Sequence, residues 1–336
     1  MAALAWPFQN AAMTIRTLRM QLNTFYSGPQ AWFFLADERG YLRDEGLAIE
    51  FTEGDTAANT IPKMAAGGFD VGYGDLNALI EHAGAGKPNA PLAVFASYNA
   101  SPYTIAVPAA GGIQTPAQLA GKRLVAHPND AALNLFAELC ARTGLAASTV
   151  AIDISAAPHS ELVPAVLAGQ WDGIFGFVNT LIAASLDAGL ATPREQWRFI
   201  EYHDHVPELY GMALMVTREL ARNEPATVQA LLRALNRGLV DTVANPEAAV
   251  DALVKRKPAM NRASNLRRLL GTLELEMGRA EGAVLGIGDL DDARFASGID
   301  LIVDTKRFAQ RPKPSDLFSR AFLPPLSERV RNLSRA

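Results

Sequence analysis

Hydrophobic and polar residues alternate in short segments up to about residue 217. A period of two is typical of β-strands, and helical patterns of about ten residues separate many of the segments. Strands are expected at 15–22, 47–52, 69–74, 91–98, 103–107, 122–126, 149–154, 172–176, 197–202 and 209–216. Helices are expected between them at 29–39, 56–66, 76–84, 129–144, 159–168 and 179–189. Strands alternating with helices form βαβ units, so we expect an α/β fold with parallel sheets.

The strand pattern ends there, and the rest of the chain is helical in pattern. Further helices are expected at 224–244, 246–256, 261–280, 290–303 and 326–334. The segment RPKPSDLF (311–318) is expected to be a loop, because its prolines remove backbone donors. These C-terminal helices have no sheet of their own, so they are expected to belong to an earlier part of the fold.

Composition narrows the class of protein. The chain has 336 residues, of which 49% are hydrophobic and 20% charged, as expected for one large or two medium globular domains. The formal net charge is −4 and no stripe of Lys and Arg is present, which argues against a nucleic-acid partner. The single cysteine, Cys140, excludes an internal disulfide and a Cys-rich zinc site, and its apolar helical surroundings predict a buried thiol.

Polar residues stand where several predicted strands give way to helices. Asp55 and Thr56 follow one strand, Asp75 follows the strand in FDVGYGD, and Asn129 and Asp130 follow another. In open α/β sheets, ligands bind beyond the carboxyl ends of the strands. Asp75 is therefore expected either to cap the next helix or to face a ligand, with the two neighbouring glycines clearing space for it.

The sequence offers little support for catalysis. His203, Asp204 and His205 have an H-x-H spacing, but no third metal ligand is evident, and a solvated connection is the favoured interpretation. No G-x-S-x-G motif is present, and GIGD (286–289) follows no strand and lacks the third glycine of a dinucleotide loop. We therefore expect no metal, no cofactor and no catalytic residue.

Five segments carry a resemblance to a known family, and the phrases AGGFDVG and AGQWDGI recur within them at equivalent places. The segments are FFLADERGYLRDEGLAIEF (33–51), IPKMAAGGFDVGYGD (61–75), TPAQLAGKRLVAHPNDAALNLF (115–136), LVPAVLAGQWDGIFGFVNTLIA (162–183) and LYGMALMVTRELARNEPATVQALLRAL (209–235). With them the chain resembles periplasmic-type solute-binding proteins of ABC importers. It is most similar to the branch that binds thiamine pyrimidine precursors, taurine, alkanesulfonates or nitrate. The resemblance covers about residues 15–260.

The resemblance implies a type II periplasmic-binding-protein fold with two lobes and two hinge crossovers. Residues 14–104 and 208–336 are expected to form the first lobe, and residues 105–207 the second, which would close on a ligand. Such a protein is a monomeric, non-catalytic receptor that delivers its ligand to an ABC permease. The N-terminus MAALAWPFQNAAMTIR lacks the pattern of a secretory leader, and no apolar run reaches the length of a membrane span. A periplasmic location, with a leader outside this numbering, is favoured over a cytoplasmic one.

The strand ends and the implied cleft together predict the ligand-binding residues. They are Phe25, Tyr26, Gln30, Asp55, Asp75, Asn77, Tyr98 and Tyr103 from the first lobe, His127, Asn129, Asp130, Phe175, Phe177 and Asn179 from the second, and Tyr210 on the return crossover. This set is rich in aromatic rings, carboxamides and carboxylates, and contains no arginine.

The absence of arginine from this set decides the ligand prediction. Small-anion sites often use Arg or Lys donors, and carboxylates repel anions. Aromatic stacking and carboxylate acceptors suit an amine-bearing heterocycle, so a thiamine-precursor pyrimidine is favoured. The alternative is a taurine, alkanesulfonate or nitrate ligand. A less favoured alternative is a thiamine-pyrimidine synthase of the same fold, whose Cys-rich motif this chain lacks.

Overall fold

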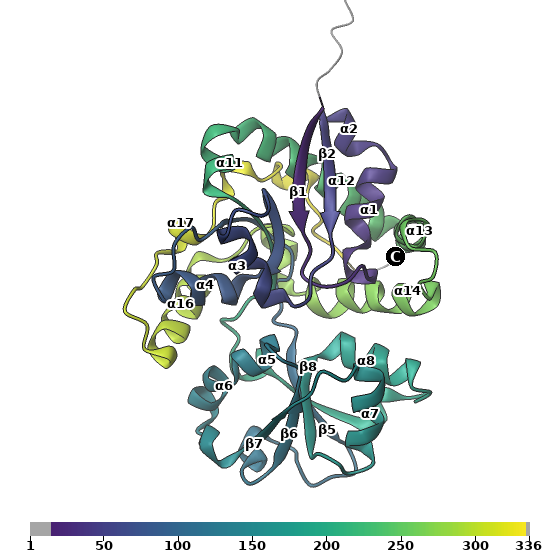
Figure 1. Cartoon of the computed structure of the whole chain (residues 1–336), viewed down its shortest axis with the longest axis vertical. Coiled ribbons are helices and arrows are strands. Elements are labelled where there is room, and N and C mark those ends of the chain that lie inside the picture. The colour runs from purple at the N-terminus through teal and green to yellow at the C-terminus, as the bar shows by residue number, and fades with distance from the viewer. Residues whose placement is uncertain (1–14, 334–336) are drawn as a thin grey trace, which may run out of the picture.

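The computed structural model describes residues 15–333. Residue 14 and residues 334–336 of the predicted first lobe, and the last residue of the predicted helix 326–334, lie outside the described residues. Two groups of elements are stacked one above the other, each built around its own sheet (Figure 1). Within residues 15–333, no helix has the length and apolar character needed to cross a membrane.

Each of the ten predicted strands is confirmed within three residues at either end. The strands are β1 (Arg16–Gln21), β2 (Leu47–Thr52), β3 (Val71–Asp75), β4 (Leu92–Ala96), β5 (Tyr103–Pro108), β6 (Arg123–Ala126), β7 (Ala151–Ile154), β8 (Gly173–Phe177), β9 (Trp197–Glu201) and β10 (Met212–Val216). They form two five-stranded sheets, in the orders β2-β1-β3-β10-β4 and β7-β6-β8-β5-β9.

The prediction of purely parallel sheets is wrong for one strand in each sheet. β10 is antiparallel to both β3 and β4, and β5 is antiparallel to both β8 and β9. These are the strands by which the chain enters one sheet directly from the other. A strand that arrives from the facing sheet runs against its neighbours, since no crossover helix has turned the chain round.

Most predicted helices are present, several of them divided into shorter pieces. Before β5 lie α1 (Ala31–Glu38), α2 (Tyr41–Asp44), α3 (Thr60–Ala65) and α4 (Leu76–Gly84). Between β6 and β10 lie α5 (Ala131–Asn134), α6 (Phe136–Thr143), α7 (His159–Leu167), α8 (Val178–Asp187), α9 (Pro193–Gln196) and α10 (Tyr202–His205). After β10 follow α11 (Arg218–Asn223), α12 (Pro225–Ala244), α13 (Pro246–Arg256), α14 (Arg262–Gly271), α15 (Ala280–Leu285), α16 (Asp292–Lys306) and α17 (Pro314–Leu317).

Three predictions for the C-terminal region are wrong. The predicted helix 326–334 is a single 3-10 turn at Leu326–Glu328, and Arg329 after it is extended. The predicted helix 261–280 is broken, because α14 widens into a π-helical turn at Thr272–Glu276 before α15 begins. The predicted loop 311–318 contains α17, since a proline at the first helical position leaves no donor unpaired.

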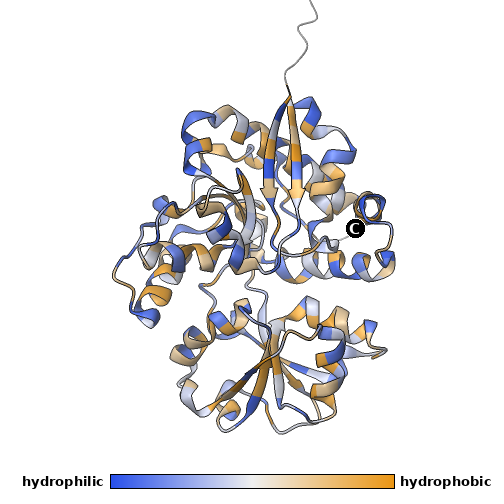
Figure 2. Cartoon of the chain, in the orientation of Figure 1, coloured by the Kyte–Doolittle hydropathy of each residue, from blue (hydrophilic) through white to orange (hydrophobic). Residues whose placement is uncertain are grey.

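Three hydrophobic cores hold these layers together. The first packs α1, α12 and α13 against one face of the sheet that contains β1, with Trp32 and Phe33 at its centre. The second contains residues of both sheets, together with α4, α6 and α16, and so joins the two halves of the molecule. The third lies between the other sheet and α7 and α8. Figure 2 shows hydrophobic and hydrophilic colours side by side on the outer helices.

Two segments connect the sheets, residues 97–102 after β4 and residues 202–211 after β9. We call the elements around the sheet of β1 the first lobe, and those around the sheet of β6 the second lobe. The C-terminal helix α14 belongs to the first lobe and faces α8 of the second (Figure 1). The residue boundaries 104/105 and 207/208 stay a prediction.

Candidate functional site

Asp75 lies in a buried hydrogen-bond network at the hinge. It caps α4 by accepting a hydrogen bond from the backbone of Asn77 at 2.8 Å, which is one of its two expected roles. The Tyr103 hydroxyl donates to its other carboxylate oxygen at 2.8 Å. The Asn77 carboxamide donates to Asp75, to the Tyr103 hydroxyl and to the Tyr210 carbonyl. The network therefore ties the end of β3 to both connections between the lobes.

Burial raises the pKa of the Asp75 carboxyl to about 6, against the opposing effect of its hydrogen bonds from Tyr103 and Asn77. Asp75 is only 1% exposed, and all the donors named above belong to the protein. The glycines of β3 do not clear space for a ligand. A side chain at Gly72 would lie 2.3 Å from Met64 Sδ, and one at Gly74 would lie 2.9 Å from Thr60, so both glycines let α3 approach the strand.

Other predicted binding residues serve the framework of the first or second lobe. Gln30 is buried and donates to Asn23, two residues after β1. Tyr26 packs on Phe34, and its hydroxyl donates to the Phe51 carbonyl at 3.2 Å. Three more predicted residues are engaged in the same way. These are Tyr98, buried edge-on against Tyr73, Asp130, which caps α5, and Phe175, buried edge-on against Phe136.

Three predicted residues keep exposed or half-buried surface. Phe25, in the turn after β1, is 66% exposed. Phe177 is half-buried at the end of β8, with its ring 5.5 Å from that of Tyr103. Asp55 is exposed and forms an ion pair with Lys63 at 3.1 Å. Phe175 and Phe177 are two residues apart on β8 and therefore point to the same side of the strand, and Phe177, its last residue, is the less buried of the two.

Two predicted residues bridge the lobes instead of standing free in a cleft. Asn129, at the end of β6, donates to Asn59 of the first lobe at 2.8 Å. Asn179, in the first turn of α8, donates to the carbonyl of Arg268 at 2.7 Å and to Thr272 Oγ1 at 3.0 Å. The two lobes are therefore in direct contact at Asn129 and at Asn179.

Between the two lobes lies a group of buried nitrogens without a hydrogen-bond partner among residues 15–333. His127 follows β6 and His159 begins α7, and their ring centroids lie 4.3 Å apart. Arg268 lies on α14 of the first lobe, close enough for its charge to lower the pKa of His159. Among residues 15–333, His127 Nε2, His159 Nε2 and Arg268 Nε find no hydrogen-bond partner although all three are buried. We call these three residues the cleft cluster.

Burial is the main cause of the pKa shifts in this cluster. It lowers the pKa of His159 to about 3, with further lowering by the charges of His127 and Arg268. It also lowers the pKa of His127 and of Arg268. Both imidazoles are therefore neutral near pH 7, and Arg268 supplies the positive charge. Unpaired buried polar groups cost free energy, so the cluster favours a ligand that pairs with them.

Glu276 is the acidic neighbour of the cleft cluster. It lies in the π-helical turn and is 3% exposed. Burial raises its pKa to about 7, while hydrogen bonds from Thr272 and Tyr98 and the charge of Arg268 oppose that shift. Because Glu276 is partly protonated near neutral pH, its repulsion of an anion at Arg268 is weakened.

Sequence reasoning missed Arg268, His159 and Glu276. His159 follows β7 as His127 follows β6, so the rule of polar residues after strands could have found it. Arg268 and Glu276 lie in a C-terminal helix with no strand beside it in sequence. Their place beside the cleft depends on how α14 packs after the chain returns to the first lobe, and no local pattern carries that information.

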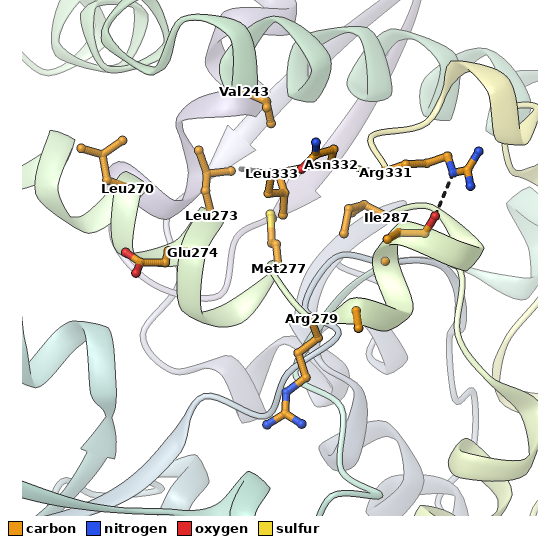
Figure 3. Close-up of a pocket in the computed structure, with 14 residues that line it drawn as sticks. Val243, Leu270, Leu273, Glu274, Met277, Arg279, Ile287, Arg331, Asn332 and Leu333 are labelled. Carbon is orange, nitrogen blue, oxygen red and sulfur yellow. Dashed lines mark hydrogen bonds between the residues drawn. The ribbon is translucent and has the colours of Figure 1, made fainter. Parts of the chain in front are cut away.

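A cavity of about 590 Å³ lies elsewhere, within the first lobe between α12, α14, α15 and residues 331–333. Figure 3 shows mostly apolar side chains around it, among them Leu273, Met277 and Leu333, while Arg279 points away from them. Binding sites usually combine an apolar wall with a few convergent polar groups, and polar groups converge instead at the cleft cluster. We therefore place the candidate site between the lobes, at the cleft cluster.

Metal and thiol chemistry find no support in the described part of the chain. Within residues 15–333, no group of three or more His, Cys, Asp or Glu side chains could hold a metal ion. His203 contacts its neighbours Glu201 and Asp204 at 3.4 and 3.2 Å. Burial raises the pKa of Cys140 to about 11, so its thiol stays protonated near neutral pH.

Comparison with known families identifies the class of protein. Residues 30–249 match the family described as NMT1/THI5 like, and the chain belongs to that family. The resemblance inferred from the sequence is thereby confirmed at the level of the family. A comparison with curated proteins gave no match.

Solved structures show the fold. The alkanesulfonate-binding protein SsuA from Xanthomonas axonopodis pv. citri, bound to MOPS, is 18% identical, with a TM-score of 0.66 over 90% of this chain and 98% of that one. The periplasmic aliphatic sulphonate binding protein SsuA from Escherichia coli is 17% identical, with a TM-score of 0.63 over 89% and 91%. The Candida albicans CA3427 gene product, described as having the generic periplasmic binding protein fold, is 14% identical, with a TM-score of 0.60 over 96% and 99%. The chain has the periplasmic-binding-protein fold.

Proposed function

We propose that the protein is a solute-binding receptor of an ABC importer that captures a small anionic solute between its lobes. The observation that carries the proposal is the cleft cluster. Buried nitrogens from both lobes lack protein partners within residues 15–333, and one belongs to an arginine. A ligand that occupies this position contacts both lobes at once, and therefore stabilises the closed arrangement over the open one.

The cleft cluster also changes the favoured ligand class. The preference for an amine-bearing pyrimidine depended on a site with carboxylates and no arginine. Asp75 is engaged by Tyr103 and Asn77, and Asp55 by Lys63, so neither carboxylate is offered to a cationic ligand. The Arg268 guanidinium supplies hydrogen-bond donors and one positive charge, which suits a sulfonate or a similar oxyanion, and the two imidazoles beside it are neutral. The two related structures named above as sulfonate-binding proteins support the same class.

Receptor function implies a location and a partner. A closed receptor of this fold would be recognised by the membrane permease of its importer, and we propose that the protein acts as a monomer in the periplasm. Binding without chemistry is the favoured activity, because Cys140 is buried and protonated and the cleft cluster contains no activated nucleophile.

A thermal-shift screen tests the ligand class. The purified chain is heated with taurine, a series of alkanesulfonates, nitrate, aminopyrimidines or purines. A ligand at a hundredfold excess over its Kd stabilises the folded state by about 2.7 kcal/mol, which is readily measured as a rise in Tm. We expect sulfonates to raise the Tm. Stabilisation by aminopyrimidines alone would contradict the anionic class and restore the pyrimidine alternative.

A second measurement separates a receptor from an enzyme. The stabilising compound is incubated with the purified chain and then analysed by mass spectrometry. Recovery of the compound unchanged is expected of a receptor. Conversion of the compound, without any added protein, would contradict the proposed function.

A further inference from the structure

Asn179 occupies a position that ligand binding does not explain. Its side chain is 5% exposed, and both hydrogen bonds of its amide nitrogen go to the other lobe. Its partners, the carbonyl of Arg268 and the hydroxyl of Thr272, lie at the junction of α14 and the π-helical turn. π-helical turns are uncommon and are often found at functional sites.

The surface of α14 is shaped to receive this side chain. Gly271, the last residue of α14, lies under the Asn179 carboxamide. A methyl group at Gly271 would lie 2.2 Å from Asn179 Oδ1 and 2.7 Å from its Cγ. Both distances are far below van der Waals contact, so only glycine allows the carboxamide to reach the Arg268 carbonyl. Glycine has a low helix propensity, so Gly271 weakens α14 locally but allows the contact with Asn179 of the second lobe.

The Asn179 contact also connects lobe closure to the candidate site. The carbonyl that accepts from Asn179 belongs to Arg268, whose side chain contributes to the cleft cluster. Thr272 Oγ1, the other acceptor, also hydrogen-bonds to Glu276, the acidic neighbour of that cluster. When α8 and α14 separate, Arg268 and Thr272 lose their hydrogen bonds from Asn179 together.

We propose that Asn179 is an interlobe latch, which docks into the seat made by Gly271, the Arg268 carbonyl and Thr272, holds the lobes closed and positions Arg268 at the cleft. The inference rests on the proposed function for its consequence, ligand retention. The latch itself is a property of the ligand-free chain and is tested there.

The test measures the closed population by fluorescence energy transfer in the full chain without ligand. Dyes are attached to cysteines placed at two exposed positions, Glu50 of the first lobe and Ser148 of the second. The variants are Asn179→Ala, which removes both donors, and Gly271→Ala, which keeps Asn179 but fills its seat. Each is expected to lower the ratio of closed to open molecules by about tenfold, as the loss of two hydrogen bonds implies.

The double variant separates a latch from a general loss of structure. If Gly271 acts only through Asn179, the Asn179→Ala/Gly271→Ala chain opens no further than Asn179→Ala alone. Far-ultraviolet circular dichroism checks folding, and alanine is expected to preserve α14 because it is the better helix former. An unchanged closed population in either single variant, or additive effects in the double variant, would overturn the latch.

The latch and the proposed function fail in different ways. If no compound in the thermal-shift screen binds but the variants still open the lobes, the latch stands and the proposed function is wrong. If a sulfonate binds but the closed population of both variants equals that of the unchanged chain, the receptor function stands and the latch is wrong.

Discussion

The hinge network and the cleft cluster are both buried and polar, but they differ in how their polar groups are satisfied. At the hinge, Asp75, Asn77, Tyr103 and the Tyr210 carbonyl bond to one another. In the cleft, His127 Nε2, His159 Nε2 and Arg268 Nε find no partner among residues 15–333. The first arrangement stabilises a fixed geometry, whereas the second leaves hydrogen-bonding capacity for a ligand. Burial alone therefore does not separate the two regions, whereas the pairing of their polar groups does.

The largest expected effect is the loss of stability on replacing Asp75 by alanine. The change removes a helix cap, which costs about 1 kcal/mol, and leaves buried donors of Tyr103 and Asn77 unpaired, at about 1–3 kcal/mol more. We expect the free energy of unfolding, measured with urea, to fall by about 2–4 kcal/mol. Asp55→Ala is the matched control, since its exposed ion pair is worth about 0–1 kcal/mol. If Asp75→Ala instead lost much of its ligand affinity with unchanged stability, Asp75 would be a ligand-binding residue and not a structural residue of the hinge.

The pH dependence of stability gives a second test of the hinge. Burial raises the pKa of Asp75 from 3.8 to about 6, so the folded chain holds this proton more tightly than the unfolded chain. Asp75 therefore adds most to the free energy of unfolding below about pH 4. This contribution is lost as the pH rises through about 6, and the free energy does not change further above that pH on account of Asp75. We expect this loss to be about 2–3 kcal/mol. Urea unfolding between pH 4 and 7 should show it in the unchanged chain but not in Asp75→Asn, and parallel curves would contradict it.

The difference between hinge and cleft also explains what the sequence could predict. The alternation in KRLVA and DGIFG identifies β6 and β8, because strand patterns are local. The capping position of Asp75 could be predicted for the same reason, since it depends on a strand followed at once by a helix. The hydrogen bond from Tyr103 to Asp75 depends on a strand 28 residues further on, and no local sequence rule predicts that contact.

Arg268 shows most clearly what local sequence patterns cannot predict. The segment RRLL is amphipathic in pattern, and its arginines look like solvated positions on a surface helix. Only the return of the chain to the first lobe places α14 against α8, and only then does Arg268 become buried while its neighbour Arg267 stays exposed and pairs with Asp187. The preference for a pyrimidine ligand rested on a predicted site without arginine, and no local pattern could have brought Arg268 into that prediction.

Replacing Arg268 tests the cleft side of the comparison. Arg268→Gln keeps much of the volume of the side chain but removes its charge, and a charge-assisted hydrogen bond contributes about 1.5–3 kcal/mol. Calorimetry with the stabilising sulfonate should therefore show a rise in Kd of about 10- to 100-fold, with little change in unfolding free energy. Arg267→Gln, one position along the same helix, is the control and should change the Kd by less than about fivefold. Equal rises in Kd for the two variants would mean that the ligand responds only to the overall positive charge of α14 and makes no specific contact with Arg268.

The smallest expected effect is at Asn129, which bridges the lobes on the other side of the cleft. Asn129 has a left-handed backbone, with φ of 55°, and is exposed. Asn129→Gly keeps that backbone without strain while removing the 2.8 Å hydrogen bond to Asn59. Because an exposed hydrogen bond contributes about 0.5–1 kcal/mol, ligand dissociation measured by stopped flow should accelerate by about two- to fivefold. Asn129→Ala removes the same bond but adds backbone strain of about 1–2 kcal/mol, so it should lower stability as well. If Asn129→Gly accelerates dissociation as much as Asn179→Ala does, the two sides of the cleft hold the lobes equally, and Asn179 has no special part in closure.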